Sequence, residues 1–220
     1  MRLSQAPYPH AGRLIEFILL FLGLPAVLFF HTTRWNVHVC LWIASIYALI
    51  LIRREGHIRW SELWNGAGWT KKDRKAAFLR FCVATLVIVL ATAYTLPERL
   101  FSFPMQRPLF WLLVMALYPI LSALPQELVF RSFFFRRYKD IFQGNNALIL
   151  ASAICFALAH VVIGNFVAPP LCFVGGLLFA YSYSQHRSLK WAAIEHAAYG
   201  CMVFTAGIGT YFLVGGGIHH

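Results

Sequence analysis

Long apolar runs, joined by loops of which every second one is basic, constrain the fold of this chain more than any other feature of its sequence. A helix needs about 17 to 25 apolar residues to cross a hydrocarbon layer of about 30 Å. Seven runs come close to that requirement, at residues 14–30, 36–52, 76–96, 109–135, 147–163, 169–185 and 191–214. The sequence therefore predicts an all-α fold, a polytopic transmembrane helical bundle of about seven spans.

Composition agrees with an integral, multi-pass membrane protein. The chain is 60% hydrophobic and 12% charged, whereas soluble domains contain about 25% charged residues. Neither a linker nor an internal repeat divides the chain, so we expect residues 1–220 to form a single membrane domain. The first run continues into "FFHTTRWN" without a small-residue cleavage site, which indicates a retained anchor and not a signal peptide.

The distribution of Lys and Arg predicts the orientation, because cytoplasmic loops retain positive charge. Residues 53–75 contain seven of these side chains, and clusters recur after the fourth and sixth spans, whereas the alternate connections carry only Arg34, Arg99 and Arg107. This pattern places the amino terminus in the cytoplasm and the carboxyl terminus outside. The net charge of +11 is explained by this topology and by membrane lipids as partners, so no nucleic-acid partner is expected. In a bacterium the location would be the cytoplasmic (inner) membrane.

Ionisable side chains inside the spans are the candidates for function, because each is costly in a bilayer. Glu16 lies near the start of the first span and is expected to be interfacial. Glu127 and Arg131 are four residues apart, so they share a helix face and can pair. Glu195 and His196 are adjacent and point about 100° apart, so only one of them can face a given site. The remaining candidate is His160.

Each of these candidates has a structural alternative, such as a buried ion pair or a packed histidine. One carboxylate and two imidazoles on three separate spans could nevertheless converge in the interior of a bundle. Such a convergence would form a proton-handling site, with Glu127, His160 and His196 at its centre.

Three motifs occur in a characteristic order: "QELVFR" at 126–131, "FALAH" at 156–160 and "EHAAYG" at 195–200, with "GG" at 175–176 between the last two. Their order and spacing resemble the CAAX prenyl protease and bacteriocin-processing family, also called the Abi family, of intramembrane endopeptidases. The resemblance covers about residues 109–200, which would be the core of the domain.

The resemblance implies a glutamic-type peptidase that acts on a membrane-associated protein or peptide and needs no cofactor. In that scheme Glu127, assisted by His160, takes a proton from the water that attacks a peptide carbonyl. His196 then helps to stabilise the oxyanion, and Arg131 supports Glu127. Prenylated tails, leader peptides and sorting tails are all possible substrates.

Two positions depart from the family pattern. Gln126 stands where the family usually has the first of two adjacent glutamates, and an amide is not a useful base. Gly200 stands where the third motif usually carries Asn, four residues after the His. Asn165 or Tyr199 could supply the missing hydrogen-bond donor.

The depths of the three motifs predict an irregular helix. At about 1.5 Å per residue, Glu127 and His196 lie roughly 13 and 9 Å from the basic ends of their spans, but His160 lies roughly 22 Å from the start of its own. Straight, upright helices would not bring the three side chains together. We therefore expect strong tilt, a deeper start of the fifth span, or a break near 143–146 or Pro125.

Other functions use the same residues. Glu127, His160 and His196 could bind a zinc ion with one position open for water, although the sequence has no H-E-x-x-H motif. A proton-coupled transporter could relay protons through them, and a non-catalytic scaffold could keep the fold without the reaction.

Overall fold

The computed structural model describes residues 9–31, 34–55, 60–65 and 68–213. Every regular element within these ranges is a helix, so the predicted all-α class is confirmed. Residues 1–8 and 214–220 lie outside the described residues. The predicted positions of the two termini relative to a membrane therefore stay predictions.

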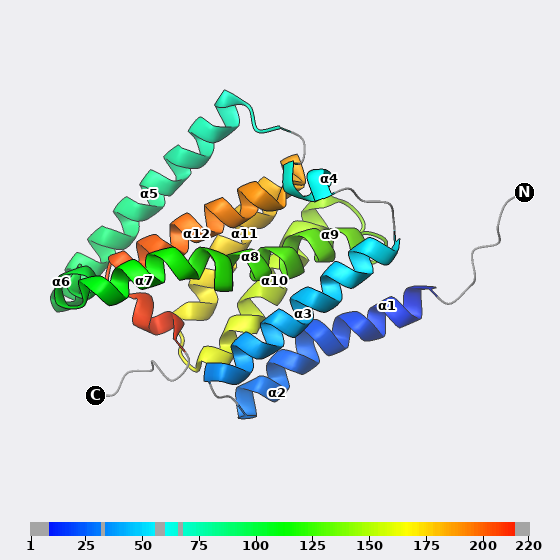
Figure 1. The fold of residues 1–220 in the computed structure, drawn as a ribbon, viewed down its shortest axis with the longest axis horizontal. Coiled ribbons are helices and arrows are strands. Elements are labelled where there is room, and N and C mark those ends of the chain that lie inside the picture. Colours follow the sequence, from blue (N-terminus) through cyan, green and yellow to red (C-terminus); the bar gives the residue numbers. More distant parts are fainter. Residues whose placement is uncertain (1–8, 32–33, 56–59, 66–67, 214–220) are drawn as a thin grey trace, which may run out of the picture.

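The first half of the chain forms peripheral helices. A first helix is built from α1, a short π-helical segment η1 and α2, and it is followed by α3, the short α4 and the long α5 (Figure 1). Their bounds are Pro9–Ile18, Leu19–Gly23, Leu24–His31, Arg34–Glu55, Trp60–Asn65 and Lys71–Thr95.

The second half contains all three motifs. In Figure 1 the helix from α7 to α9 runs across the middle of the molecule, with α12 on one side of it and α3 on the other. The elements are η2 (Pro97–Arg99), α6 (Ser102–Gln106), α7 (Pro108–Tyr118), η3 (Pro119–Ala123), α8 (Leu124–Glu127), η4 (Leu128–Phe133), α9 (Phe134–Arg137), α10 (Asn145–His160), η5 (Val161–Ile163), α11 (Ala168–His186), α12 (Leu189–Thr205) and η6 (Gly209–Phe212).

Among the described residues, five helices are long and apolar enough to cross a membrane by length and composition. They cover Ala11–His31, Asn36–Arg54, Lys71–Thr95, Pro108–Arg137 and Asn145–Ile163. The last two predicted spans correspond to α11 and α12. The end of α11 is polar ("YSYSQH") and α12 has only 17 residues, so the count of seven is not confirmed and stays a prediction.

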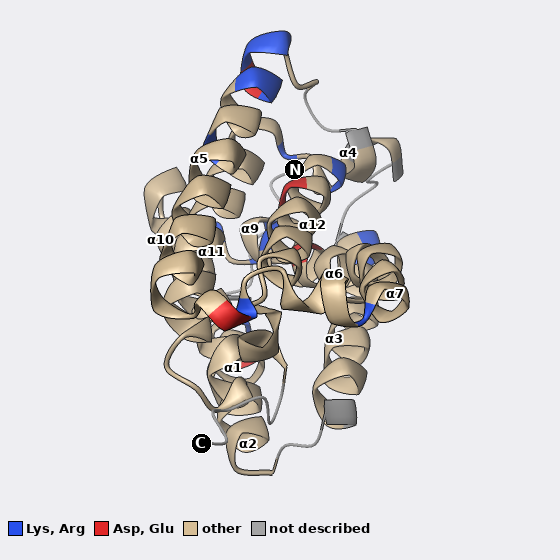
Figure 2. Cartoon of the chain, turned by 90° about the vertical axis from the view of Figure 1, so that its left-hand side faces the viewer, with Lys and Arg blue, Asp and Glu red and all other residues tan. Residues whose placement is uncertain are grey.

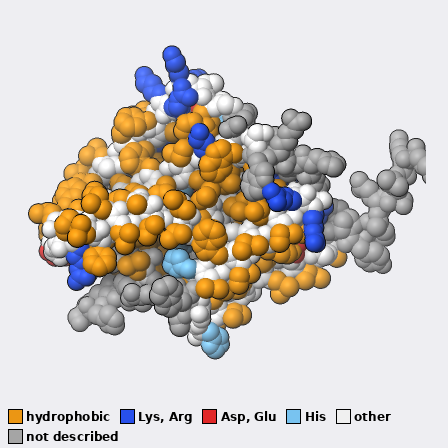
Figure 3. Space-filling view, viewed as in Figure 1, with side chains coloured by type: hydrophobic (Ala, Val, Ile, Leu, Met, Phe, Trp, Pro, Cys, Tyr) orange, Lys and Arg blue, Asp and Glu red, His pale blue; other side chains and the backbone are white. Residues whose placement is uncertain are grey.

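The surface has the character expected of a protein in lipid. Hydrophobic side chains cover most of the face drawn in Figure 3, and Lys and Arg lie at its edges. The start of α5 carries the densest basic group in Figure 2, from the sequence "KKDRK" at residues 71–75. Large apolar side chains farther along α5, such as Leu86 and Leu90, are exposed, and contact with lipid would remove them from water.

An aromatic cluster joins the first helix to the end of the fourth span. Phe17 and Phe21 pack against Phe134 and Tyr138 with ring centroids 5.2 to 6.1 Å apart and mostly edge-to-face, a favourable arrangement for aromatic rings. Beside this cluster, Glu16 accepts hydrogen bonds from Arg137 and from the hydroxyl groups of Tyr47 and Tyr138. Glu16 therefore ties three helices together at the predicted interface.

The helices α10 and α11 approach each other closely at Gly176. A Cβ atom at this position would lie 3.1 Å from the Cα of Ala153, so a larger residue would push the two helices apart. Because α10 carries His160 and α12 follows α11, this contact helps to set the distance between the second and third motifs.

Candidate active site

The helix that carries the first motif is irregular at the site, as the depths of the motifs predict. Two π-helical segments, η3 and η4, flank the four-residue helix α8. Pro119 and Pro125 have no backbone N–H, so the regular hydrogen-bond ladder cannot continue through them. Such π-helical segments are frequent at functional sites because they redirect side chains. Here the irregularity surrounds Gln126, Glu127 and Arg131.

Glu127 is the last residue of α8 and is completely buried. Its Oε1 accepts a hydrogen bond from Nδ1 of His196 at 2.9 Å. Its Oε2 lies 3.2 Å from Nε of Arg131, although neither of these two atoms has a hydrogen-bond partner among the described residues. The contact with Arg131 is therefore an ion pair without the alignment of a hydrogen bond. One carboxylate thus contacts both an imidazole and a guanidinium.

Arg131 is also completely buried, and several groups hold its guanidinium in place. Nη1 donates to the hydroxyl of Ser152 at 2.9 Å. The guanidinium carbon lies 4.9 Å from the ring centroid of Phe156 and 5.9 Å from that of Phe179, within the range of cation–π attraction. A buried charge needs such partners, so Arg131 and Glu127 are fixed as one unit.

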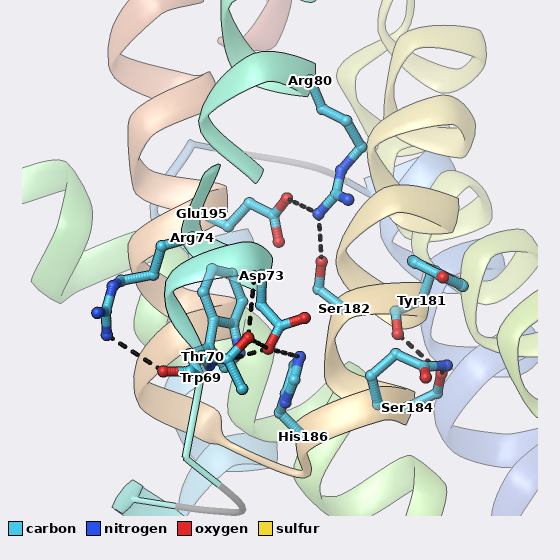
Figure 4. A network of polar contacts seen from close by, with 11 residues as sticks. Trp69, Thr70, Asp73, Arg74, Arg80, Tyr181, Ser182, Ser184, His186 and Glu195 are labelled. Carbon is cyan, nitrogen blue, oxygen red and sulfur yellow. Dashed lines mark hydrogen bonds and ion pairs between the residues drawn. The ribbon is translucent and has the colours of Figure 1, made fainter. Parts of the chain in front are cut away.

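Glu195 and His196 point to different surroundings, as their adjacency requires. The His196 ring stacks on Phe179 with centroids 4.8 Å apart and bonds Glu127 in the interior. The carboxylate of Glu195 instead accepts a hydrogen bond from Arg80 of α5 at 3.3 Å. Arg80 also donates to Ser182 of α11 at 3.1 Å, so it joins α5, α11 and α12 in one polar contact (Figure 4).

His160 is the last residue of α10 and its tautomer is set by the backbone. Nδ1 lies 2.7 Å from the carbonyl oxygen of Phe156, and a carbonyl can only accept, so Nδ1 carries the hydrogen. Nε2 is then a lone-pair acceptor. The ring of Phe156 contacts both histidines, with centroids 4.6 Å from His160 and 5.4 Å from His196. Phe156 therefore brings the second and third motifs together.

One cavity of about 540 Å³ connects these groups. Its polar lining includes Gln126, His160, His196 and Tyr118, and most of the remaining lining is apolar. Glu127 and Arg131 do not line it, since they lie behind His196 in the protein interior. Of the predicted site residues, the structure thus places Gln126 and both histidines at the cavity and the ion pair behind them.

Gln126 lies on the cavity wall at the position where the family has its first glutamate. Its amide nitrogen donates to the hydroxyl of Ser122 at 2.8 Å. Its amide oxygen is buried without a hydrogen-bond partner among the described residues. This amide thus leaves one acceptor next to the cavity unused.

In the described part of the chain, neither of the two expected donors, Asn165 and Tyr199, forms a hydrogen bond with His196. The Asn165 side chain donates to the carbonyl of Tyr211 and accepts from the backbone at the start of α11. Tyr199 lines the cavity, but its hydroxyl has no hydrogen-bond partner among the described residues. The hydroxyl of Tyr118 instead lies 3.0 Å from Nε2 of His196. Sequence reasoning missed Tyr118, because it stands in an apolar run outside the motifs.

No group of three or more His, Cys, Asp or Glu side chains in the described part of the chain is arranged to hold a metal ion. Glu127 bonds His196 in the interior and, unlike the two histidines, does not line the cavity. The zinc alternative stays a prediction that metal analysis can test.

Comparison with known proteins agrees with the motifs. The model of the family described as type II CAAX prenyl endopeptidase Rce1-like matches residues 108–202. This range contains all three motifs and nearly coincides with the predicted core at 109–200, so the resemblance is confirmed. No curated protein and no solved structure gives a significant match to the chain.

Proposed function

We propose that this chain, whose residues 108–202 match the type II CAAX prenyl endopeptidase Rce1-like family, is an intramembrane endopeptidase. The family match supports the reaction class, the hydrolysis of a peptide bond in a membrane-associated protein or peptide. The observation that carries the proposal is the convergence of the three motifs, with Glu127 bonded to His196 at 2.9 Å and both histidines at one cavity.

His160 is the group best placed to take a proton from the attacking water. Its Nδ1–H bonds the Phe156 carbonyl, which leaves the lone pair of Nε2 free for a water in the cavity. A general base must reach the proton that it removes, so geometry is the first criterion. The backbone bond also keeps the imidazole from rotating.

Glu127 acts through His196 in this mechanism. Its carboxylate is enclosed by His196 and Arg131, and it holds His196 as the tautomer that carries hydrogen on Nδ1. This arrangement is that of a carboxylate orienting a histidine in a catalytic triad. The direct role of Glu127 in activating water stays a prediction, and the contacts of its carboxylate favour a positioning role.

The cavity favours an apolar substrate. Its lining is mainly aliphatic and aromatic, and it lies among the helices that are able to span a membrane. A lipid-modified or strongly apolar peptide segment would enter such a cavity without loss of hydration, whereas the described residues that line it include no Lys or Arg to attract a nucleic acid. The protein would act in its own membrane, which in a bacterium is the cytoplasmic membrane.

Gln126 favours a second candidate function. An amide on the cavity wall at the usual position of an acid would fit a protein that binds a membrane peptide without cleaving it. Purified protein incubated in detergent with a prenylated peptide ending in a CAAX sequence separates the two functions. Endopeptidase activity predicts product peptides in mass spectrometry that increase with time. Retention of intact peptide, without products, would support the binding function.

A further inference from the structure

The hydroxyl of Tyr118 is a candidate for a catalytic group that the motifs do not include. Tyr118 ends α7, immediately before the π-helical segment η3, and it lines the cavity. Its Oη lies 3.0 Å from Nε2 of His196. The ring packs edge-to-face on Phe204 with centroids 5.6 Å apart, which restrains the direction of the hydroxyl.

Gly200 makes room for this tyrosine. A Cβ atom at position 200 would lie 2.2 Å from Cε1 and 2.3 Å from Oη of Tyr118. Atoms cannot approach so closely, so any side chain at 200 would displace the ring. Gly200 follows His196 by four residues on α12, and thus lies on the same face of the helix. The Tyr118 hydroxyl therefore occupies the space that a side chain at position 200 would enter.

The hydrogen between Tyr118 and His196 belongs to the tyrosine in the resting site. Nδ1 of His196 donates to Glu127, and the charge of Glu127 is already offset by Arg131 at 3.2 Å. In an imidazole that carries its single hydrogen on Nδ1, Nε2 has only a lone pair to offer. Nε2 is then an acceptor, and the Tyr118 hydroxyl donates to it.

We infer that Tyr118 is a catalytic hydrogen-bond donor that stabilises the oxyanion, in the place of the side chain missing at Gly200. The inference rests on the proposed function and extends it to a named group. Rotation about the C–O bond turns the hydroxyl hydrogen from Nε2 of His196 to an oxyanion in the same cavity. A bond to a charged oxygen is roughly twice as strong as one to a neutral acceptor, so the donor favours the tetrahedral state over the ground state.

The reaction balances with the groups present and one water. The water oxygen bonds the peptide carbonyl carbon as its proton passes to Nε2 of His160, and the carbonyl electron pair moves to the oxygen that Tyr118 then bonds. When the intermediate collapses, the C–N bond breaks and the leaving nitrogen takes the proton from His160. The products are a carboxylic acid and an amine, and the Tyr118 hydroxyl returns to His196.

Tyr118→Phe tests the hydroxyl alone, because the ring and its packing on Phe204 remain. Cleavage of a prenylated CAAX peptide should show kcat lowered by about 10²- to 10³-fold, with KM and thermal stability near those of the wild type. Unchanged kcat in Tyr118→Phe would overturn the inference. A loss of kcat that is accompanied by a loss of thermal stability would also overturn the inference, since it would indicate a structural role.

A double substitution tests the exchange between positions 118 and 200. Tyr118→Ala clears the space, and Gly200→Asn then supplies an amide donor from α12. One such donor contributes about 10²- to 10³-fold to kcat. The double variant should therefore have a kcat at least about tenfold higher than that of Tyr118→Ala. Tyr118→Ala with Gly200→Leu fills the space without a donor and should recover none. Equal recovery by Asn and Leu would contradict a donor role.

A measurement independent of turnover separates this inference from the proposed function. In histidine-¹⁵N-labelled protein, Tyr118→Phe should move the Nε2 resonance of His196 toward that of a non-bonded imidazole nitrogen, and an unmoved resonance would overturn the inference. A wild-type protein that cleaves no peptide refutes the proposed function and the catalytic role of Tyr118 together. An active wild type with an equally active Tyr118→Phe refutes only the role of Tyr118.

Discussion

Glu127 and His196 are 69 residues apart in the sequence, and their side chains are joined by a hydrogen bond of 2.9 Å in the buried interior. This contact links the first and third motifs directly. The imidazole of His196 lines the cavity, whereas the carboxylate of Glu127 is completely buried and does not line it. The stability of the site and its chemistry can therefore be tested by different substitutions.

The Glu127–Arg131 pair predicts strong coupling in stability. Glu127→Gln leaves the completely buried Arg131 without its counter-charge, a loss that costs about 3–5 kcal/mol in buried pairs. Arg131→Met should cost a similar amount. The double variant should lose less unfolding free energy than the sum of the losses in the two single variants. Denaturant unfolding of detergent-solubilised protein measures these losses. Additive losses would show that the two charges do not interact.

Gln126 predicts a gain of activity. Gln126→Glu places a carboxylate on the wall of the cavity that His160 also lines, and a positioned general base contributes about 10²–10⁴-fold. We expect kcat/KM for a prenylated CAAX peptide to rise by at least about tenfold, as a part of that effect. The matched variant Gln126→Ala should not raise it. A Gln126→Glu variant no faster than Gln126→Ala would exclude a catalytic contribution from this position.

The sequence alone was sufficient for the helical class and for the meeting of the motifs. Apolar runs predict helices because their length and composition suit a bilayer, and intramembrane ionisable residues point to the site because of their cost. Straight, upright helices would place His160 at a different depth from Glu127 and His196, so tilt, a deeper fifth span, or a break near 143–146 or Pro125 was expected, and the structure has π-helical segments on both sides of α8.

Contacts made by residues outside the motifs were beyond prediction. The position of Tyr118 depends on the absent side chain of Gly200 and on packing with Phe204. The sequence marks Gly200 as a departure in the third motif, but it gives no sign that Tyr118 fills the space. The partner of Glu195 was hidden for a similar reason. Arg80 lies 115 residues away on a helix whose placement depends on the whole bundle.

Glu195 and His196 should behave differently although they are neighbours. The Glu195 carboxylate bonds Arg80, which is partly exposed, so Glu195→Gln should lower stability by only ~1 kcal/mol and leave the cleavage rate close to that of wild type. His196→Gln removes the link to Glu127 and to the cavity, and should abolish cleavage. Thermal unfolding and peptide cleavage measured on the same preparations test this contrast. Loss of cleavage in both variants would place Glu195 in the chemistry.

Metal analysis tests the zinc alternative. Glu127 bonds His196 in the interior and does not line the cavity that the two histidines share, so a zinc ion there would lack its carboxylate ligand, and we expect peptide cleavage to persist after chelation and dialysis. Elemental analysis of the purified protein should find no stoichiometric zinc. One zinc per chain, whose removal stops cleavage and whose return restores it, would instead support a metal-dependent peptidase.

In the proposed function His160 activates water at a cavity shared with His196, and a comparison of three proteins tests this role. Cleavage of a prenylated CAAX peptide is measured for the wild type, for His160→Asn, and for the control His186→Asn, which lies at the end of α11 outside the cavity. The wild type and the control should cleave at similar rates, and His160→Asn should be slower by about 10²–10⁴-fold. Equal rates in all three proteins, or no cleavage by the wild type, would contradict the claim.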